Sequence, residues 1–370
     1  MKKNIILALA ALTMLACAEK NTPDAGHGNF NNIKWNFKNG ILTISGTGDM
    51  EQDQITFSWP WSDYRKKITQ VIIEEGITSI GYYAFSGCTN LTSVTIPSSV
   101  TSIGEEAFYD CNSLPVFDNL RYADTYLVGT SDRLQSAYTI KDGTKWIGND
   151  AFNHCICLTS IQIPNTIISI GKAAFRYCIV LDSINIPNSV ARIENEVFED
   201  CYSLTSVTIP NSVTSIGSNA FCGCINLTSI EIPNSVITIG GSVFGNCVSL
   251  TSPVYNDHVF AFMPISYTGA YSISNGIEYI AGGAFASCKV LTSIEIPNSV
   301  VSIGDFAFSG CIGLTSVTCL AINPPILEES MFQFEGGMDR STIPLYVPNQ
   351  SVEAYKSAYI WKDFNPIVGI

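Results

Sequence analysis

Histidine is scarce in this sequence of 370 residues, which contains only three. They are His27, His154 and His258, and none forms a recognisable motif with a serine, a cysteine or a carboxylate. A nucleophilic side chain must lie within hydrogen-bonding reach of the histidine that activates it, and a third group must orient that histidine. The carboxylates are scattered without a fixed pair spacing, and no glycine-rich phosphate loop is present. We therefore expect a protein that is not an enzyme and binds no cofactor.

Basic residues are also few, because 19 lysines and arginines stand against 32 aspartates and glutamates, for a formal net charge of −13. Nucleic acids and anionic membrane surfaces attract cationic patches, so this balance argues against both as partners. The simplest explanation of the acidity is solubility.

The apolar run near the N-terminus, residues 5–15, is too short to span a bilayer and has the length of a signal-peptide core. Met14-Leu-Ala-Cys17 resembles a lipobox, in which the cysteine is lipidated, although the same cysteine with its flanking alanines would also suit an ordinary signal peptidase. We predict a signal peptide over 1–16, lipidation at Cys17 and a polar tether over 17–31. The protein would then be an exported outer-membrane lipoprotein at the cell surface, touching the membrane only through its lipid anchor.

The sequence is rich in one repeat. The segment 204–224 nearly recurs at 227–247, a shift of 23 residues. A phenylalanine followed three positions later by a cysteine marks nine copies, at Phe85/Cys88, Phe108/Cys111, Phe152/Cys155, Phe175/Cys178, Phe198/Cys201, Phe221/Cys224, Phe244/Cys247, Phe285/Cys288 and Phe308/Cys311. A fixed period of this size is typical of a solenoid, in which each copy forms one turn of the coil, termed a rung here.

Within one copy, Ile230 and Ile232 alternate with polar residues, which is the pattern of a strand with one buried face. Pro233 ends that strand, Gly240 allows a second turn, and residues 241–247 are expected to form short helical turns. We therefore predict an α/β repeat solenoid with a 23-residue period. Short parallel strands would lie on one face and short helical turns on the other, with a cap at each end.

The solenoid is predicted over 68–319, between an N-terminal cap with a β-hairpin (32–67) and a C-terminal cap (320–370). Two rungs are enlarged, at 115–143 and 253–276, and we term these the first and second excursions. Both begin with a Pro-Val-aromatic triplet, and each is expected to hold an aromatic-rich hairpin, over 122–128 and 258–263. Trp59 and Trp61 would form either a sugar platform or a hydrophobic lid on the first rung.

The consensus Leu-x-x-Ile-x-Ile-Pro-x-Ser-Val-x-x-Ile-Gly-x-x-Ala-Phe-x-x-Cys resembles the BspA-like leucine-rich repeats of bacterial surface proteins. The flanking segments, such as Leu345-Tyr-Val-Pro348, are similar to that family as well. The resemblance implies a secreted or lipid-anchored surface protein. Members of the family are linked to adhesion, by binding host matrix and plasma proteins or other cells.

Thirteen cysteines in an exported chain raise the question of disulfides, and nine of them occupy one repeat position. Neighbouring copies would lie about 5 Å apart, within range of a bridge, but stacked side chains point the same way. We therefore expect a buried column of reduced cysteines. Cys157, Cys222 and Cys319 lie off the column, and Cys222-Gly-Cys224 lacks the spacing of a metal site.

The outward side of the strand ladder, termed the strand face, is flat, rich in hydroxyls and sparsely charged. Its candidate ligand-binding residues are Ser160, Gln162, Ser183, Asn185, Ser206, Thr208, Ser229, Glu231, Ser293 and Glu295. Such residues would either contact an extended partner or merely solvate the sheet. The excursions add the aromatic candidates Tyr122, Tyr126, Tyr255, Phe260 and Phe262, which would either be exposed for binding or pack on the adjacent rung.

These observations favour a surface-anchored, non-enzymatic adhesion protein that recognises extracellular or host cell-surface proteins through the strand face and the excursions. The alternative is a glycan-binding surface protein for nutrient capture. A hydrolase with a site between the C-terminal cap and the last rung is a distant third.

Overall fold

The computed structural model describes residues 24–50, 58–327 and 339–370. The predicted signal peptide, Cys17 and the first part of the tether lie outside these ranges. The chain divides into two compact units, Met1–Leu114 and Pro115–Ile370.

The N-terminal unit is built on a five-stranded sheet in the order β1-β2-β3-β5-β7 and a three-stranded sheet in the order β4-β6-β8. Strands β1 to β3 run antiparallel and include the predicted hairpin, whereas β3, β5 and β7 pair in parallel. The elements are β1 (Ala25–Phe30), β2 (Ile33–Lys38), β3 (Ile41–Gly46), β4 (Gly48–Asp49), the 3₁₀ helix η2 (Ser62–Tyr64), β5 (Gln70–Ile73), β6 (Ile77–Ile80), β7 (Ser93–Thr95) and β8 (Ser102–Ile103).

The structure differs from the predicted tether over Ala25–Phe30, which forms β1 and pairs along its whole length with β2. The physical reason is a shared aromatic contact, because Phe30 packs 5.6 Å from Trp59 and 5.8 Å from Trp61. Both tryptophans are buried, and their indole N–H groups donate to backbone carbonyls of the next rung at 2.8 and 2.7 Å. Because both rings are buried, they do not form an exposed sugar platform.

The C-terminal unit contains six sheets, in the orders β15-β13-β11-β10-β9, β12-β14, β16-β18-β20, β17-β19-β21, β22-β23-β25-β27-β29 and β24-β26-β28-β30-β31. In the first half, the strands are β9 (Val116–Phe117), β10 (Leu120–Ala123), β11 (Tyr126–Thr130), β12 (Ala137–Thr139), β13 (Trp146–Ile147), β14 (Ser160–Gln162), β15 (Ser169–Ile170), β16 (Ser183–Asn185), β17 (Arg192–Ile193), β18 (Ser206–Thr208), β19 (Ser215–Ile216), β20 (Ser229–Ile230) and β21 (Thr238–Ile239).

The second half contains β22 (Val254–Tyr255), β23 (Val259–Phe262), β24 (Gly269–Ser272), β25 (Tyr279–Ile280), β26 (Leu291–Ile296), β27 (Ser302–Ile303), β28 (Ser316–Cys319), β29 (Ile326–Leu327), β30 (Leu345–Val347), β31 (Ile367–Gly369), the helix α2 (Val352–Ser357) and the 3₁₀ helices η3 (Arg340–Thr342), η4 (Asn349–Ser351) and η5 (Trp361–Asp363). In the described residues α2 is the only α-helix, so the fold is a β-solenoid with little helix.

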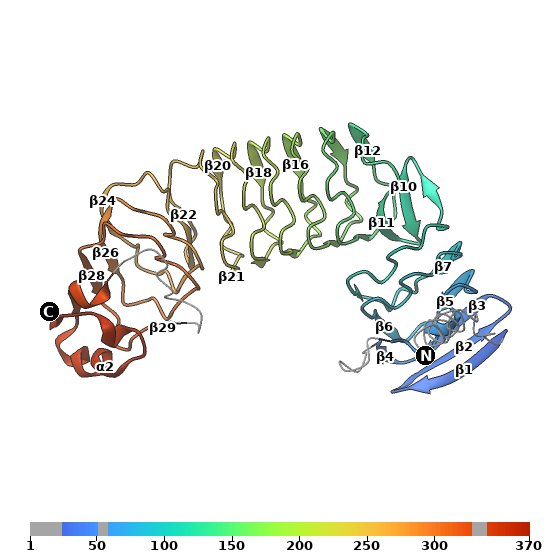
Figure 1. The fold of residues 1–370 in the computed structure, drawn as a ribbon, viewed down its shortest axis with the longest axis horizontal. Coiled ribbons are helices and arrows are strands. Elements are labelled where there is room, and N and C mark those ends of the chain that lie inside the picture. The colour runs from blue at the N-terminus through green and yellow to red at the C-terminus, as the bar shows by residue number, and fades with distance from the viewer. Residues whose placement is uncertain (1–23, 51–57, 328–338) are drawn as a thin grey trace, which may run out of the picture. The chain divides into compact units, whose positions relative to one another are not determined.

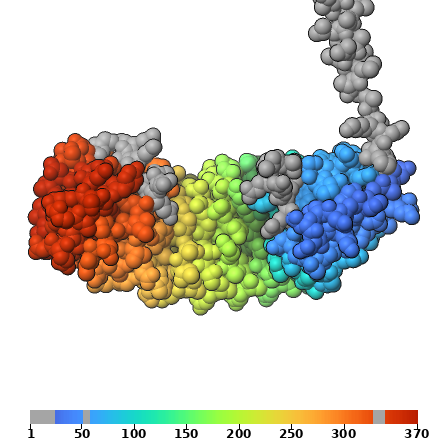
Figure 2. Space-filling model, turned by 90° about the horizontal axis from the view of Figure 1, so that it is seen from below, coloured from blue at the N-terminus to red at the C-terminus, as the bar shows by residue number. Residues whose placement is uncertain are grey.

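Stacking of rungs is regular in the middle of this unit, where parallel strands β16, β18 and β20 stand side by side (Figure 1). Ser183 pairs with Ser206 and Ser206 with Ser229, so each partner lies 23 residues along the chain. In the space-filling view, successive colours of the C-terminal unit form adjacent bands, as stacked rungs require (Figure 2).

The predicted helical turns at 241–247 are instead a chain of hydrogen-bonded turns. Alternate backbone N–H groups donate to carbonyls of the next rung, as Phe221 does to Val243 at 3.0 Å. These groups therefore cannot form the hydrogen bonds of a helix. Two residues of this turn, four positions apart, also have a positive φ, Ser242 at 53° and Asn246 at 58°. A right-handed helix cannot pass through that conformation.

Phenylalanine and cysteine form two buried columns inside the coil. Phe175, Phe198 and Phe221 stack with ring centroids 5.7 and 5.3 Å apart. All nine column cysteines are buried, which confirms the predicted column. The Cys201 thiol, for example, donates to the carbonyl of Phe175 at 3.1 Å.

We predict that Phe198→Ala lowers the free energy of unfolding by about 3–5 kcal/mol, because the ring loses two stacked neighbours and leaves a cavity. Chemical denaturation followed by circular dichroism measures the loss. Tyr202→Ala, at a position 38% exposed, should change the value by less than about 0.5 kcal/mol. Equal losses in the two variants would contradict the stacked column.

We also predict that the column thiols do not react in the native protein. Burial raises the pKa of Cys201, and it raises that of Cys247 to about 12, so neither forms the nucleophilic thiolate at pH 8. Titration with a disulfide reagent should detect the half-buried Cys157 first and the column only after unfolding. Cys157→Ser should remove the fast phase. Native reaction of column thiols at the rate of Cys157 would refute the packing.

Candidate binding surfaces

The ten predicted strand-face residues point outward in the structure, and all are exposed except Ser293, which is half-buried. The ladder brings Ser183, Ser206 and Ser229 into one row and sets Asn185 beside Thr208. It does not join all ten residues. Those on β14, those on β16 to β20 and those on β26 belong to three separate sheets.

A column of threonines beside these residues has a role that sequence reasoning missed. The Thr228 hydroxyl donates to the backbone carbonyl of Thr205 at 3.3 Å, and Thr315 does the same to Thr292 at 2.9 Å. These hydroxyls are used in joining one rung to the next. The Leu-Thr-Ser triplet of most repeats is the sequence signal that could have revealed them.

Two of the ten candidates on the strand face carry a negative charge. Glu231 and Glu295 are both exposed, and Glu295 accepts a hydrogen bond of 2.8 Å from Ser272 on the neighbouring strand. Asp182, which precedes the candidate Ser183 in the chain, is also exposed and accepts a hydrogen bond of 2.9 Å from the Ser183 hydroxyl. A row of hydroxyls with scattered carboxylates can accept and donate hydrogen bonds along an extended partner.

Four of the five predicted excursion aromatics are buried, which corrects their assignment as ligand contacts. Tyr122, Tyr126, Phe260 and Phe262 have relative exposures between 1% and 8%. Phe260 stacks on Phe285 at 4.7 Å. The Tyr122 hydroxyl accepts a hydrogen bond from the Lys141 backbone at 3.1 Å, and burial raises the pKa of this tyrosine. These rings close the core where the rung is enlarged.

Each excursion does contain an antiparallel hairpin. In the first, β10 pairs with β11 as predicted. In the second, β22 pairs with β23, so one arm lies earlier in the chain than the predicted 258–263. The short strands β9 and β22 stand at the outer edges of their sheets.

The exposed aromatic of each excursion is the one in the Pro-Val-aromatic triplet. Phe117 is 55% exposed and Tyr255 is 46% exposed, with Tyr255 stacked at 5.9 Å on Phe260. Phe117 was not among the predicted contacts, although the shared triplet was visible in the sequence. These two rings are therefore the better aromatic candidates for an interface.

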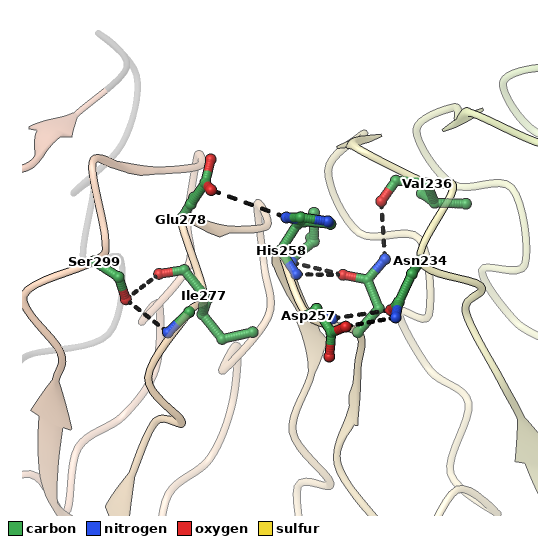
Figure 3. Close-up of polar contacts among 10 residues, drawn as sticks. Asn234, Val236, Asp257, His258, Ile277, Glu278 and Ser299 are labelled. Atoms are coloured by element: carbon green, nitrogen blue, oxygen red, sulfur yellow. Dashed lines mark hydrogen bonds and ion pairs between the residues drawn. The ribbon is translucent and has the colours of Figure 1, made fainter.

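Asn256 holds the second excursion in place from a buried position. Its side-chain amide donates to the carbonyls of Pro233 and Val236 at 3.0 and 2.8 Å, and its oxygen accepts from the backbone of His258 and Val259. Nearby, Asn234 and Asp257 face each other across adjacent rungs, and His258 points toward Glu278 at 3.9 Å (Figure 3).

No group of three or more histidines, cysteines or acids that could hold a metal exists in the part of the chain that the structure describes. Within the same residues, no helix has the length and apolar character needed to span a membrane. His27 lies opposite Asn36 in the β1–β2 pair, and the ring of His154 packs at a tilt against that of Tyr177, with centroids 4.5 Å apart. The contact of His258 with Glu278 pairs this histidine with a carboxylate, whereas none of these three contacts is with a serine or a cysteine.

Comparison with known proteins identifies the repeat. The family model described as BspA type leucine rich repeat region matches in six copies, over residues 63–126, 145–271 and 260–361. No curated protein sequence matches the chain.

Several solved structures are similar to the chain. A leucine-rich repeat protein from Bacteroides ovatus is 26% identical, covering 86% of this chain and 76% of that one, with a TM-score of 0.43. A leucine rich cell surface protein from Faecalibacterium prausnitzii is 23% identical over 86% and 100% of the two chains, with a TM-score of 0.32. The pneumococcal vaccine antigen PcpA is 12% identical over 94% and 99%, with a TM-score of 0.33.

We predict that Asn256→Ala detaches the second excursion at a cost of about 3 kcal/mol, because several buried backbone groups lose their partner. Native-state hydrogen exchange should speed up at the amides of His258 and Val259. The exposed Asn234→Ala variant should leave both amides protected. Unchanged exchange in Asn256→Ala would mean that other contacts hold the hairpin.

Proposed function

The chain belongs to the BspA-type leucine-rich repeat family, and from that premise we propose that it is a cell-surface binding protein that adheres to host or other extracellular proteins. The observation that carries the proposal is the strand face. It presents exposed hydroxyl and amide side chains in rows on stacked parallel strands, as at Ser183, Ser206 and Ser229. A regular, rigid surface of this kind can bind an extended partner through many shallow contacts.

The proposed location is the outer surface of the cell, with anchorage to the outer membrane through lipid on Cys17. Support comes from Lys2 and Lys3, from the apolar run over residues 5–15 that follows them, and from the lipobox-like residues before Cys17. The related protein from Faecalibacterium prausnitzii is itself named a cell surface protein.

The proposal includes end caps on a solenoid with a 23-residue repeat. At the N-terminal end, Trp61 stacks on Phe85 at 5.9 Å and covers the first rung. At the C-terminal end, Tyr355 and Trp361 are buried and donate to the carbonyls of Ala321 and Pro325. Without such covers, the last rungs would expose their apolar interior.

A second candidate function is glycan binding for nutrient capture, and the exposed Tyr255 favours it. Its ring stacks nearly parallel to Phe260, with an interplanar angle of 7°, so the pair holds the ring firmly. Sugars pack their apolar faces on such rings, and the exposed Asp257 two residues on supplies an acceptor for hydroxyls. We propose no catalytic role for either surface.

We predict that reversing two strand-face charges, with Glu231→Lys and Glu295→Lys in one variant, weakens saturable binding to an immobilised extracellular-matrix fraction about tenfold. The reason is that a partner selected for this surface would meet like charge. A variant with Asp63→Lys and Glu353→Lys carries the same charge change away from the strand face and should bind normally.

The absence of saturable binding to matrix and cell-surface fractions would refute the adhesion proposal. Hits on a glycan array that are lost in Tyr255→Ala but kept in the strand-face variant would establish the second candidate in its place.

A further inference from the structure

The turns that join β15 to β16 and β17 to β18, and the equivalent turns of other rungs, form what we term the turn face. In the C-terminal unit this face carries a network of ion pairs. Glu196 lies 3.7 Å from Lys172 and 3.4 Å from Arg176, which both belong to the preceding rung. Arg176 also contacts Glu199 at 2.6 Å and lies 5.0 Å from the centroid of the Tyr177 ring. A guanidinium group thus occupies the space between two carboxylates and an aromatic face.

The N-terminal unit has a glutamate at the same repeat position but no cations opposite it. With Phe85 aligned to Phe175 and Phe108 to Phe198, Glu106 corresponds to Glu196. The positions of Lys172 and Arg176 are taken by Tyr82 and Ser86.

The backbone pairing of these turns is the same in both units. Tyr83 donates its N–H to the Glu105 carbonyl at 3.1 Å, as Ala173 does to that of Asn195 at 3.0 Å. The comparison is therefore between equivalent places in equivalent turns, one with its cations and one without.

Three exposed tyrosines lie in the same two turns as these glutamates. Tyr82, Tyr83 and Tyr109 are 56%, 44% and 61% exposed, whereas Glu105 and Glu106 are half-buried. Tyr109 lies in the same turn as Glu106, to whose carbonyl it donates at 3.0 Å. We term these five residues the tyrosine–glutamate patch.

The patch is electrostatically negative. The charge of Glu106 raises the pKa of Tyr83, followed by burial, a side-chain hydrogen bond to Glu106 and the charge of Glu105. Among the described residues, no ion pair joins Glu105 or Glu106 to a cation. The cations beside the preceding turn have other contacts, since Arg65 donates to the Ser62 carbonyl at 3.0 Å and Lys66 to the Thr89 hydroxyl at 3.4 Å.

We propose that the tyrosine–glutamate patch binds lysine or arginine side chains of a basic segment in a partner protein. The partner's cation takes the place that Arg176 fills in the C-terminal unit, between a carboxylate and an aromatic ring. Carboxylates give charge-assisted hydrogen bonds, and tyrosine faces attract cations held over them. Because the patch has three rings and two carboxylates in adjacent turns, it can contact several basic side chains of one segment. This second surface goes beyond the proposed strand-face function and does not depend on it.

Titration calorimetry of the full chain tests the proposal, with a synthetic peptide of alternating lysine and serine as the probe and a glutamate–serine peptide as its counterpart. We expect the lysine peptide alone to bind. Glu105→Gln with Glu106→Gln should weaken that binding about tenfold. Tyr82→Ala with Tyr109→Ala should weaken it about threefold. Glu105→Lys with Glu106→Lys should reverse the preference toward the glutamate peptide, a gain that misfolding cannot produce.

The matched control is Glu231→Gln with Glu295→Gln, which removes the same charge from the strand face and should leave the peptide affinity within about twofold. Equal weakening in this control would show attraction by net charge alone and would overturn the proposal. Failure of the lysine peptide to bind, or full affinity in the tyrosine variant, would also overturn it. Binding to a matrix fraction by the strand face is measured separately, so either surface can fail without the other.

Discussion

Each rung of this solenoid depends on the next rung to satisfy its backbone and to cover its interior. Along the turns, alternate N–H groups donate to carbonyls one rung further on, as Phe198 does to Ala220 at 2.8 Å. Inside, the ring of Phe198 lies between those of Phe175 and Phe221. Because polar and apolar requirements are met by the same neighbour, the rungs are held in one register, and outward residues 23 positions apart must form straight rows.

The two excursions begin where this mutual pairing is interrupted. Pro115 and Pro253 have no N–H to donate to a ladder, and in both places the chain turns into a short antiparallel edge strand. The interior must still be sealed there, which explains why Tyr122 and Phe260 point inward. The aromatics that remain outside, Phe117 and Tyr255, come directly after the interruption.

The two faces of the coil differ in chemistry because they are made from different parts of the repeat. The strand face presents short hydroxyl and amide side chains. Some of these hydroxyls donate hydrogen bonds to backbone carbonyls of the preceding rung, as that of Thr228 does. The turn face presents longer side chains, so neighbouring rungs can form ion pairs such as that of Arg176 with Glu199. A substitution at one repeat position, such as tyrosine for lysine, therefore changes the surface without disturbing the backbone pairing below it.

The repeat by itself determined the solenoid, the parallel strands, the stacked Phe175, Phe198 and Phe221 and the buried cysteines, because a fixed period forces equivalent residues into equivalent environments. It also placed the strand-face residues on the outside. Only the tertiary structure decided that the turns at 241–247 are not helical, since the competing hydrogen bonds come from another rung. Likewise, the burial of Tyr126 and the exposure of Phe117 depend on how each excursion folds over its neighbours, which no spacing within the repeat can specify.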